Sequence, residues 1–183
     1  MAAICLNLAK VLSKISMNKN LVLTKKDVFD FLTSQNLMTL ATYGNHPWIA
    51  SVFYSFDKDL NLYFLSNPAT IHGRQMKKNK MVTAAIFDSH QKPSDVKRGL
   101  QIYGYVEKVS GINKIRHAIR LWKDFLNVNR PDISLENMKK GLYKGRMYRL
   151  TPKKIKLFDQ EKFKVPDGEE PVLKLLKKPA LTF

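Results

Sequence analysis

The stretch from Leu37 to Ser66, LMTLATYGNHPWIASVFYSFDKDLNLYFLS, decides the fold. It contains three runs rich in strand-forming residues, and the turn sequences GNHP and DKDLN separate them. Connections this short join antiparallel neighbours, because parallel strands need crossovers of about a dozen residues or more. The stretch therefore predicts an antiparallel meander of three strands.

Helices are expected on both sides of this meander. Upstream, Thr24 stands where an N-cap residue would and Asp27 follows three residues later, ahead of an apolar stripe that runs to about Gln35. Downstream, the polar and basic stretch ATIHGRQMKKNK (69–80) predicts an exposed helix or helical turn.

Three more strands and a longer helix follow. MVTAAIF (81–87) is almost continuously apolar, so we expect both of its faces to be covered. GLQIYGYVEKV (99–109) alternates, and Gly104 in its middle indicates a bulge, a barrel bend or a close backbone contact. From residue 112, apolar residues at helical spacing predict a helix with one buried and one very basic face. RMYRLTPKKIKLF (146–158) is the last expected strand.

The elements together predict a mainly β protein, a small barrel of five or six antiparallel strands with a few helices between them. The length of 183 residues and the 44% hydrophobic content suit one globular domain, which we place at residues 21–160. Residues 161–183, which contain three prolines, form a tail. Residues 1–20 form an amphipathic extension, which is either dispensable before a second start at Met17 or a helix that touches a membrane or a partner.

The charge balance favours anionic partners without specifying them. Thirty-two Lys and Arg against fifteen Asp and Glu give a net charge of +17, which attracts phosphate-bearing molecules. The lysines are also spread along the whole chain, as on an ordinary solvated surface. The single cysteine, Cys5, agrees with a reducing compartment, so we expect a cytoplasmic protein. No apolar run approaches the roughly 20 residues that a membrane span needs.

Most catalytic and metal-binding motifs are missing from the sequence. The four histidines are not spaced as ligand pairs, and one cysteine is too few for a zinc set. GxSxG, Walker and GxGxxG motifs are absent as well. We therefore expect no metal site and find no nucleophile with a base.

A candidate phosphate site follows the third strand. Hydroxyls and backbone amides at a strand-to-helix junction, with cations behind them, suit a phosphomonoester. The same residue types also make plain turns and helix caps, so the pattern alone leaves both interpretations open. The residues concerned are Ser66, Thr70, His72, Arg74, Lys77 and Lys78.

The order of these segments resembles the pyridoxamine 5'-phosphate oxidase-like superfamily of FMN-binding split barrels, over about residues 24–160. The segments that carry the resemblance are LMTLAT, WIASVFYSFD, LYFLSNPATIHGRQM, MVTAAIF and GLQIYGYVEKV, and they are most similar to a small, functionally uncharacterised bacterial branch. The resemblance implies a six-stranded antiparallel split β-barrel of Greek-key type with two or three flanking helices. It also implies a homodimeric FMN-dependent oxidoreductase with the flavin at the subunit interface.

The resemblance assigns the FMN site residue by residue. The backbone of the second strand would meet the edge of the flavin ring, and the end of the third strand with its following turn would hold the phosphate. Gln101 would reach the flavin from a neighbouring strand, and Trp48 would cover the site. The complete candidate set is Trp48, Ser51, Val52, Phe53, Leu65, Ser66, Thr70, His72, Arg74 and Gln101.

Two positions depart from the family pattern. Ala50 and Ile71 stand where many members carry an arginine for the phosphate. Charge-assisted hydrogen bonds contribute roughly 1.5–3 kcal/mol each, so we expect weaker FMN binding unless Arg74, one helical turn after Ile71, compensates. The pyridoxine-binding residues of the oxidase itself are not recognisable, and the redox substrate stays open.

Two other functions are compatible with the sequence. One is a non-enzymatic module that binds nucleic acid or an acidic partner, with Tyr103 and Tyr105 stacking on bases. The other keeps the barrel but binds haem, a deazaflavin or no cofactor, with His72 or His117 as the test for an iron ligand. The cations that would serve the first alternative are Lys114, Arg116, Arg120, Lys123 and those of the KKNK run at 77–80.

Overall fold

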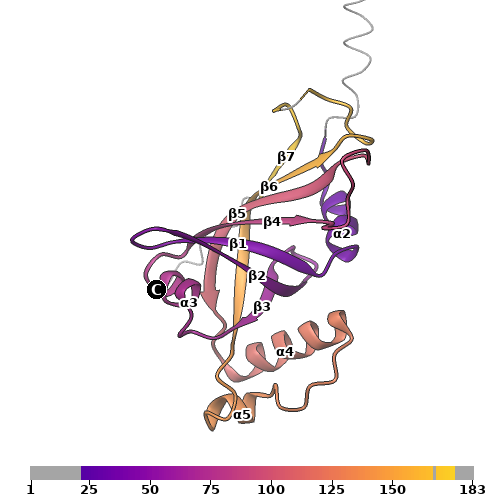
Figure 1. Cartoon of the computed structure of the whole chain (residues 1–183). Coiled ribbons are helices and arrows are strands. Elements are labelled where there is room, and N and C mark those ends of the chain that lie inside the picture. Colours follow the sequence, from indigo (N-terminus) through magenta and orange to yellow (C-terminus); the bar gives the residue numbers. More distant parts are fainter. Residues whose placement is uncertain (1–21, 167, 176–183) are drawn as a thin grey trace, which may run out of the picture.

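The predicted meander forms one side of a closed antiparallel barrel in a computed structural model that describes residues 22–166 and 168–175 (Figure 1). The strand order is β3-β2-β1-β4-β5-β6, and β3 also pairs with β6, which closes the barrel. The fourth strand returns beside the first, so the Greek-key prediction is confirmed. The strands are β1 (Leu37–Tyr43), β2 (Pro47–Phe56), β3 (Leu62–Ser66), β4 (Met81–Phe87), β5 (Arg98–Lys108) and β6 (Arg146–Asp159).

The predicted helices are present at the expected places. α2 (Lys25–Thr33) begins at Thr24, whose side chain accepts a hydrogen bond from the backbone N–H of Asp27, while the Asp27 carboxylate accepts one from the Thr24 backbone. α3 spans Ile71–Lys78 and α4 spans Ile112–Leu126. No helix among the described residues is long and apolar enough to cross a membrane.

Two elements were not predicted. α5 (Leu135–Lys139) is a single short helix that packs on α4, and β7 (Val172–Lys174) adds to the edge of β6 within the expected irregular tail. The predicted N-terminal helix, Met17 and Cys5 lie outside the described residues, as does the end of the tail.

The main core fills the barrel. Inward-facing side chains such as Leu40, Phe64 and Leu150 are fully buried, and burial of such a side chain stabilises the fold by about 1.5–3 kcal/mol. α2 closes one end, where the Tyr54 hydroxyl donates a hydrogen bond to the backbone carbonyl of Leu32 at 3.0 Å.

A second, smaller core lies outside the barrel, between its wall and α4. Ile119 and Trp122 of α4 pack with Tyr63 of β3 and Met147 of β6. Trp122 also donates its indole N–H to the backbone carbonyl of Phe53 at 3.1 Å. α4 therefore covers the outer surface only around β2, β3 and β6 (Figure 1).

The pairing of β2 with β3 is short. It covers three residue pairs, from Tyr54 with Phe64 to Phe56 with Leu62. Before Tyr54, β2 pairs only with β1, and after Phe64, β3 pairs only with β6. We call this separation, between residues 47–53 of β2 and residues 65–66 of β3, the split.

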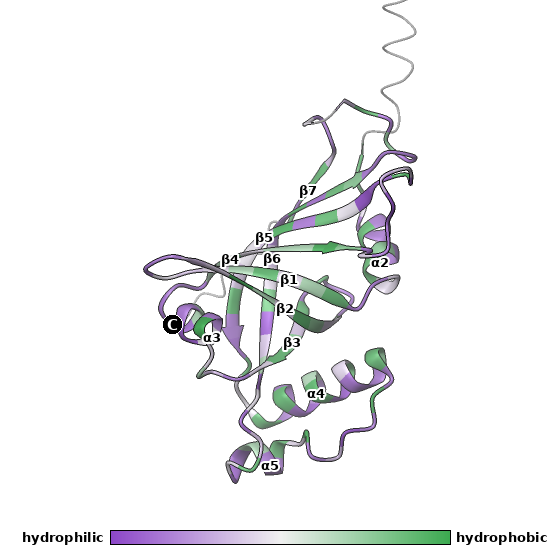
Figure 2. Cartoon of the chain, viewed as in Figure 1, coloured by the Kyte–Doolittle hydropathy of each residue, from purple (hydrophilic) through white to green (hydrophobic). Residues whose placement is uncertain are grey.

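The outer surface of β4 contradicts one prediction. Exposed and buried residues alternate along this strand, so one face is uncovered in the single chain. Met81 and Phe87, at its two ends, are 49% and 50% exposed. Figure 2 shows this hydrophobic strand next to β1, with β2 on the far side of β1. A continuous apolar run predicted coverage on both faces, and within one chain only the inner face is covered.

Gly104 is where β5 bends. The register with β6 shifts between Tyr103 and Gly104, and an added Cβ at Gly104 would lie 2.4 Å from the backbone oxygen of Thr151. The predicted bulge and close backbone contact are both present.

Substitution of Gly104 by Ala should lower the free energy of unfolding by about 2 kcal/mol, because backbone atoms must move to admit the methyl group. The comparison is Gly99→Ala, where the clash is with the ring of Phe158, a half-buried side chain that can turn away. Urea denaturation of both variants tests this, and equal losses would contradict the assignment of a backbone constraint at Gly104.

Candidate functional site

The outward side of β1, β2, β4 and β5 forms a broad uncovered surface, which we call the sheet face. Strand register brings its side chains into rows, with Leu37 beside Phe53 and Ala41 beside Ile49. Ile49 is 68% exposed. Apolar surface this extensive on a single chain marks an interaction site. The exposed large side chains of the sheet face are Leu37, Ile49, Phe53, Met81, Phe87, Tyr103 and Tyr105.

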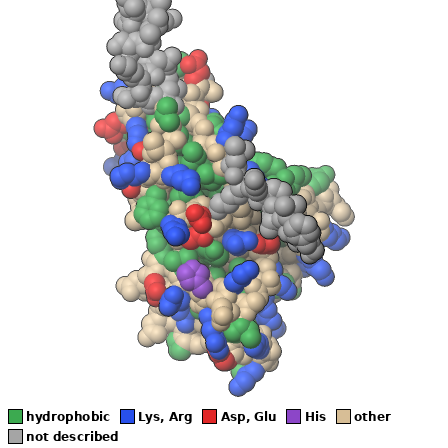
Figure 3. Space-filling view, turned by 180° about the vertical axis from the view of Figure 1, so that it is seen from behind, with side chains coloured by type: hydrophobic (Ala, Val, Ile, Leu, Met, Phe, Trp, Pro, Cys, Tyr) green, Lys and Arg blue, Asp and Glu red, His purple; other side chains and the backbone are tan. Residues whose placement is uncertain are grey.

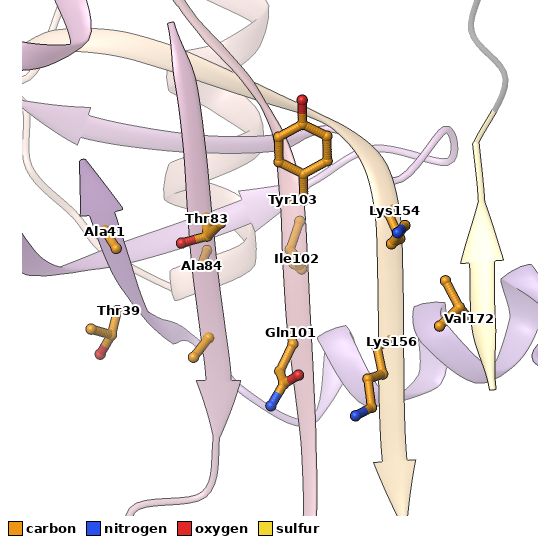
Figure 4. A pocket seen from close by; sticks show the side chains of 11 residues that line it. Thr39, Ala41, Thr83, Ala84, Gln101, Ile102, Tyr103, Lys154, Lys156 and Val172 are labelled. Carbon is orange, nitrogen blue, oxygen red and sulfur yellow. The ribbon is translucent and has the colours of Figure 1, made fainter. Parts of the chain in front are cut away.

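The middle of the sheet face is hollowed (Figure 4). Small side chains such as Thr39, Ala41 and Thr83 form the floor of a cavity of about 570 Å³. Gln101 of β5 stands at its wall, paired in register with Lys156 of β6. A hollow with an apolar floor and polar side chains at its wall suits a flat molecule with polar edges.

The turn after β3 gathers three predicted residues. Nε2 of His72 lies 2.6 Å from Oγ of Ser66 and 3.2 Å from Oγ1 of Thr70. Thr70 is also the N-cap of α3, since its hydroxyl accepts from the backbone N–H of Gly73 and donates to the carbonyl of Asn67. The phosphate and helix-cap interpretations therefore describe the same side chain.

His72 does not add a positive charge to this turn. Burial lowers the pKa of the His72 ring below its usual value, so the ring is neutral at pH 7 and acts as a hydrogen-bonding group. Ala50 and Ile71 are partly buried and offer no side-chain donor. Without a bound anion, the turn supplies hydroxyls, amides and a neutral imidazole.

Arg74 is separated from this cluster. Its guanidinium donates to the carbonyl of Ala69, and its side chain lines a different cavity together with Lys77 and Lys78. The structure thus brings Ser66, Thr70 and His72 together and groups Arg74 with the two lysines.

The backbone groups of β2 point alternately towards β1 and towards the split. The N–H of Tyr54 donates to the carbonyl of Asn36 on the β1 side. Because backbone groups of successive strand residues point to opposite sides, those of Val52 face β1, and those of Ser51 and Phe53 face the split. The Phe53 carbonyl is already bound by Trp122. Ser51 is therefore the better placed of the two for a ligand in the split.

The remaining predicted residues lie around the split. Trp48 is 42% exposed on the β1–β2 hairpin and packs edge-to-face with His46, whereas Leu65 packs against the α4 core. Gln75 was not predicted as a site residue. It is buried, and its side chain accepts a hydrogen bond from the Thr42 hydroxyl at 2.6 Å and donates one to the His46 carbonyl at 2.9 Å. Gln75 fixes α3 to the hairpin above the split.

Ser55 is a second residue that the sequence did not reveal. Among the described residues, its hydroxyl is the buried side-chain polar atom without a hydrogen-bond partner. Ser55 pairs with Tyr63, one residue pair from the point where β2 and β3 separate. Leaving such a group unpaired costs about 1–3 kcal/mol, which a polar ligand or a water would recover.

The residues on which the haem and nucleic-acid alternatives depend are not gathered into one site. His117 is exposed on α4, and the His72 ring is hydrogen-bonded to Ser66. Arg116 is paired with Glu136 at 3.0 Å, and Tyr103 and Tyr105 lie on the sheet face. Within the described ranges, no group of three or more His, Cys, Asp or Glu side chains could hold a metal. Lys and Arg side chains are spread over the back of the molecule (Figure 3).

The barrel and the split define the class, a six-stranded antiparallel split-barrel protein. The family model described as pyridoxamine 5'-phosphate oxidase matches residues 24–140. The chain belongs to this family.

Solved structures share the fold at low sequence identity. The conserved hypothetical protein Rv2991 from Mycobacterium tuberculosis is 17% identical, with a TM-score of 0.64 over 81% of this chain and 92% of that one. A FAD-binding protein from Mesorhizobium loti is 13% identical, with a TM-score of 0.56 over 73% of this chain and 90% of that one. A heme-binding protein from Mycobacterium smegmatis is 17% identical, with a TM-score of 0.57 over 79% and 56% of the two chains. No curated protein matches the sequence.

Protonation of His72 should destabilise the fold. The unfolded chain takes up a proton here near the ordinary histidine pKa of 6.5, before the folded chain does. The free energy of unfolding should therefore fall as the pH drops from 7 to 5. Urea titrations should show a shallower pH dependence in His72→Gln, whereas His117→Gln, at an exposed position, should keep the wild-type slope. Identical slopes in all three proteins would contradict a buried neutral His72.

Proposed function

We propose that the chain is an FMN-binding oxidoreductase that acts as a homodimer, with each flavin held in the split of one subunit against the sheet face of the other. The observation that carries this proposal is the combination of an open split with an uncovered apolar sheet face beside it. Membership in the pyridoxamine 5'-phosphate oxidase family supports it. We also propose a cytoplasmic location, from the single cysteine.

A second copy is the occupant that suits the sheet face best. A twofold interface needs a self-complementary patch, and a flat β-surface of Ile49, Phe53 and Met81 with small residues between them can pack against itself. The dimer would also cover the outer side of β4, as its continuous apolar sequence requires. It would bring Gln101 of one subunit opposite the split of the other.

The residues of the turn fit a phosphate without arginine. The N-terminus of the eight-residue helix α3 presents backbone N–H groups and the positive end of its dipole. Ser66 and Thr70 add hydroxyls, and a bound phosphate dianion would favour protonation of His72. Arg74 would have to leave the Ala69 carbonyl to take part.

The ring of the flavin would lie along the second strand. The backbone groups of Ser51 face the split and would hydrogen-bond the edge of the ring, as Gln101 of the other subunit would from across the interface. Trp48 on the hairpin would exclude water from one side. Bound FMN supplies hydride transfer, and the protein supplies placement and a dry environment.

Substitution of Ile49 by Asp should convert the dimer to a monomer, because it would bury two carboxylates without partners at the centre of the interface. Sedimentation velocity measures the outcome at micromolar concentration. Leu142→Asp is the matched control, since Leu142 is 74% exposed in the segment after α5, away from the sheet face. A monomeric wild-type protein, or an unaffected I49D dimer, would refute the proposed interface.

Substitutions in the turn after β3 should either weaken or tighten the affinity for FMN, depending on whether they remove or add a hydrogen-bond donor. Ser66→Ala should weaken the affinity about tenfold, the equivalent of one hydrogen bond to a charged group. Ile71→Arg should tighten it by a similar factor, because it adds a guanidinium at the start of α3. Quenching of flavin fluorescence measures both. Affinities that neither variant changes would place the phosphate elsewhere.

A further inference from the structure

The cavity lined by Arg74, Lys77 and Lys78 lies between α3, the end of β5 and the start of β6, and we call it the α3 cavity. Its volume is about 900 Å³, compared with about 570 Å³ for the cavity of the sheet face. Gly73, Arg74, Met76 and Lys77 line it from α3, although His72 and Ser66 do not. It is therefore distinct from the phosphate turn, which uses other side chains of the same helix.

The floor of this α3 cavity is apolar. Met76, Val106 and Tyr148 are each at most 5% exposed. Tyr148 is held in place by stacking on Phe64, with ring centroids 5.4 Å apart and an interplanar angle of 15°. Gly73 lets the backbone come close, since an added Cβ would lie 2.6 Å from the carbonyl of Asn67. The floor is rigid and suits a flat apolar group.

The rim is strongly cationic, and its charges come from two sides. α3 and its exit contribute four cations, and β5 contributes a fifth across the opening. Glu107 is the one acid that lines the cavity, and it is paired with Arg149. Among the described residues, no carboxylate forms an ion pair with any of the five rim cations, which are Arg74, Lys77, Lys78, Lys80 and Lys108.

From these features we infer that the α3 cavity binds a nucleotide that carries at least two phosphates, with its base on the floor and its phosphates between the rim cations. Five cations without acidic partners need several negative charges, more than one carboxylate supplies. The buried apolar floor needs a ligand with a flat apolar part, which inorganic phosphate lacks. The volume is in the range of small-molecule sites, about 300–1,000 Å³.

The inference is independent of the proposed flavin site, because the two sites share no lining side chain apart from Arg74. Arg74 belongs to this cavity in the structure, and its bond to Ala69 holds it at the rim. A nucleotide here would neutralise the exposed end of α3 and leave Ser66, Thr70 and His72 unchanged.

Isothermal titration with ADP tests the inference, with the protein saturated with FMN so that ADP cannot occupy a flavin site. We expect saturable binding of one ADP per chain, with adenosine and pyrophosphate each at least tenfold weaker. The double variant Lys77→Glu and Lys108→Glu removes one cation from each wall and should weaken ADP binding at least tenfold. Lys139→Glu and Lys140→Glu, both exposed at the end of α5, make the same change in net charge elsewhere and should leave ADP binding unchanged.

Three results would overturn the inference. The first is absence of ADP binding in a folded protein, as judged by its thermal transition. The second is pyrophosphate binding as tight as ADP binding, which would mean a site for anions alone. The third is a single-stranded oligonucleotide that binds more tightly than ADP and loses affinity in both double variants, which would indicate a diffuse nucleic-acid surface.

Discussion

The early separation of β2 from β3 is the constraint on which the rest of the candidate site depends. The two strands share hydrogen bonds over three residue pairs, and from Phe53 outward the edge of β2 has no strand beside it. An uncovered edge is a liability for a β protein. Trp122 donates a hydrogen bond to one carbonyl of this edge, and Gln75 donates one to the His46 carbonyl in the hairpin. Both hydrogen bonds hold β2 in place where β3 does not pair with it.

The sheet face is exposed because the longest described helix, α4, covers a different part of the barrel. α4 covers the outside of the barrel over parts of β2, β3 and β6, whereas outward side chains of β1, β4 and β5, such as Leu37, Met81 and Tyr103, stay exposed. The result is an apolar surface next to an open edge, and both are uncovered in the single chain. A second copy would complete the surface, and a flat polar-edged ligand between the copies would complete the edge. This is why dimerisation and cofactor binding belong to one proposal.

The sequence predicted those features of the fold that depend on residues close together in the chain or on the backbone conformation of one residue. Thr24 with Asp27 marked the start of α2, and Gly104 marked the bend of β5, because a capping box and a backbone contact leave a direct signature. Contacts between distant segments leave none. The bond from Trp122 to Phe53 joins residues 69 positions apart, and nothing near Phe53 signals it. Helical spacing from Ile71 predicted that Arg74 would reach the phosphate turn. Its side chain instead lines the α3 cavity together with Lys77.

Native mass spectrometry of the protein mixed with excess FMN shows whether the cofactor site needs two subunits, because it counts chains and cofactors in one particle. We expect a particle of two chains and two FMN molecules. Loss of the dimer on substitution of Ile49 should remove both flavins together, since each site needs both subunits. Monomers that each retain one FMN, or dimers that never bind it, would rule out an FMN site shared by two subunits.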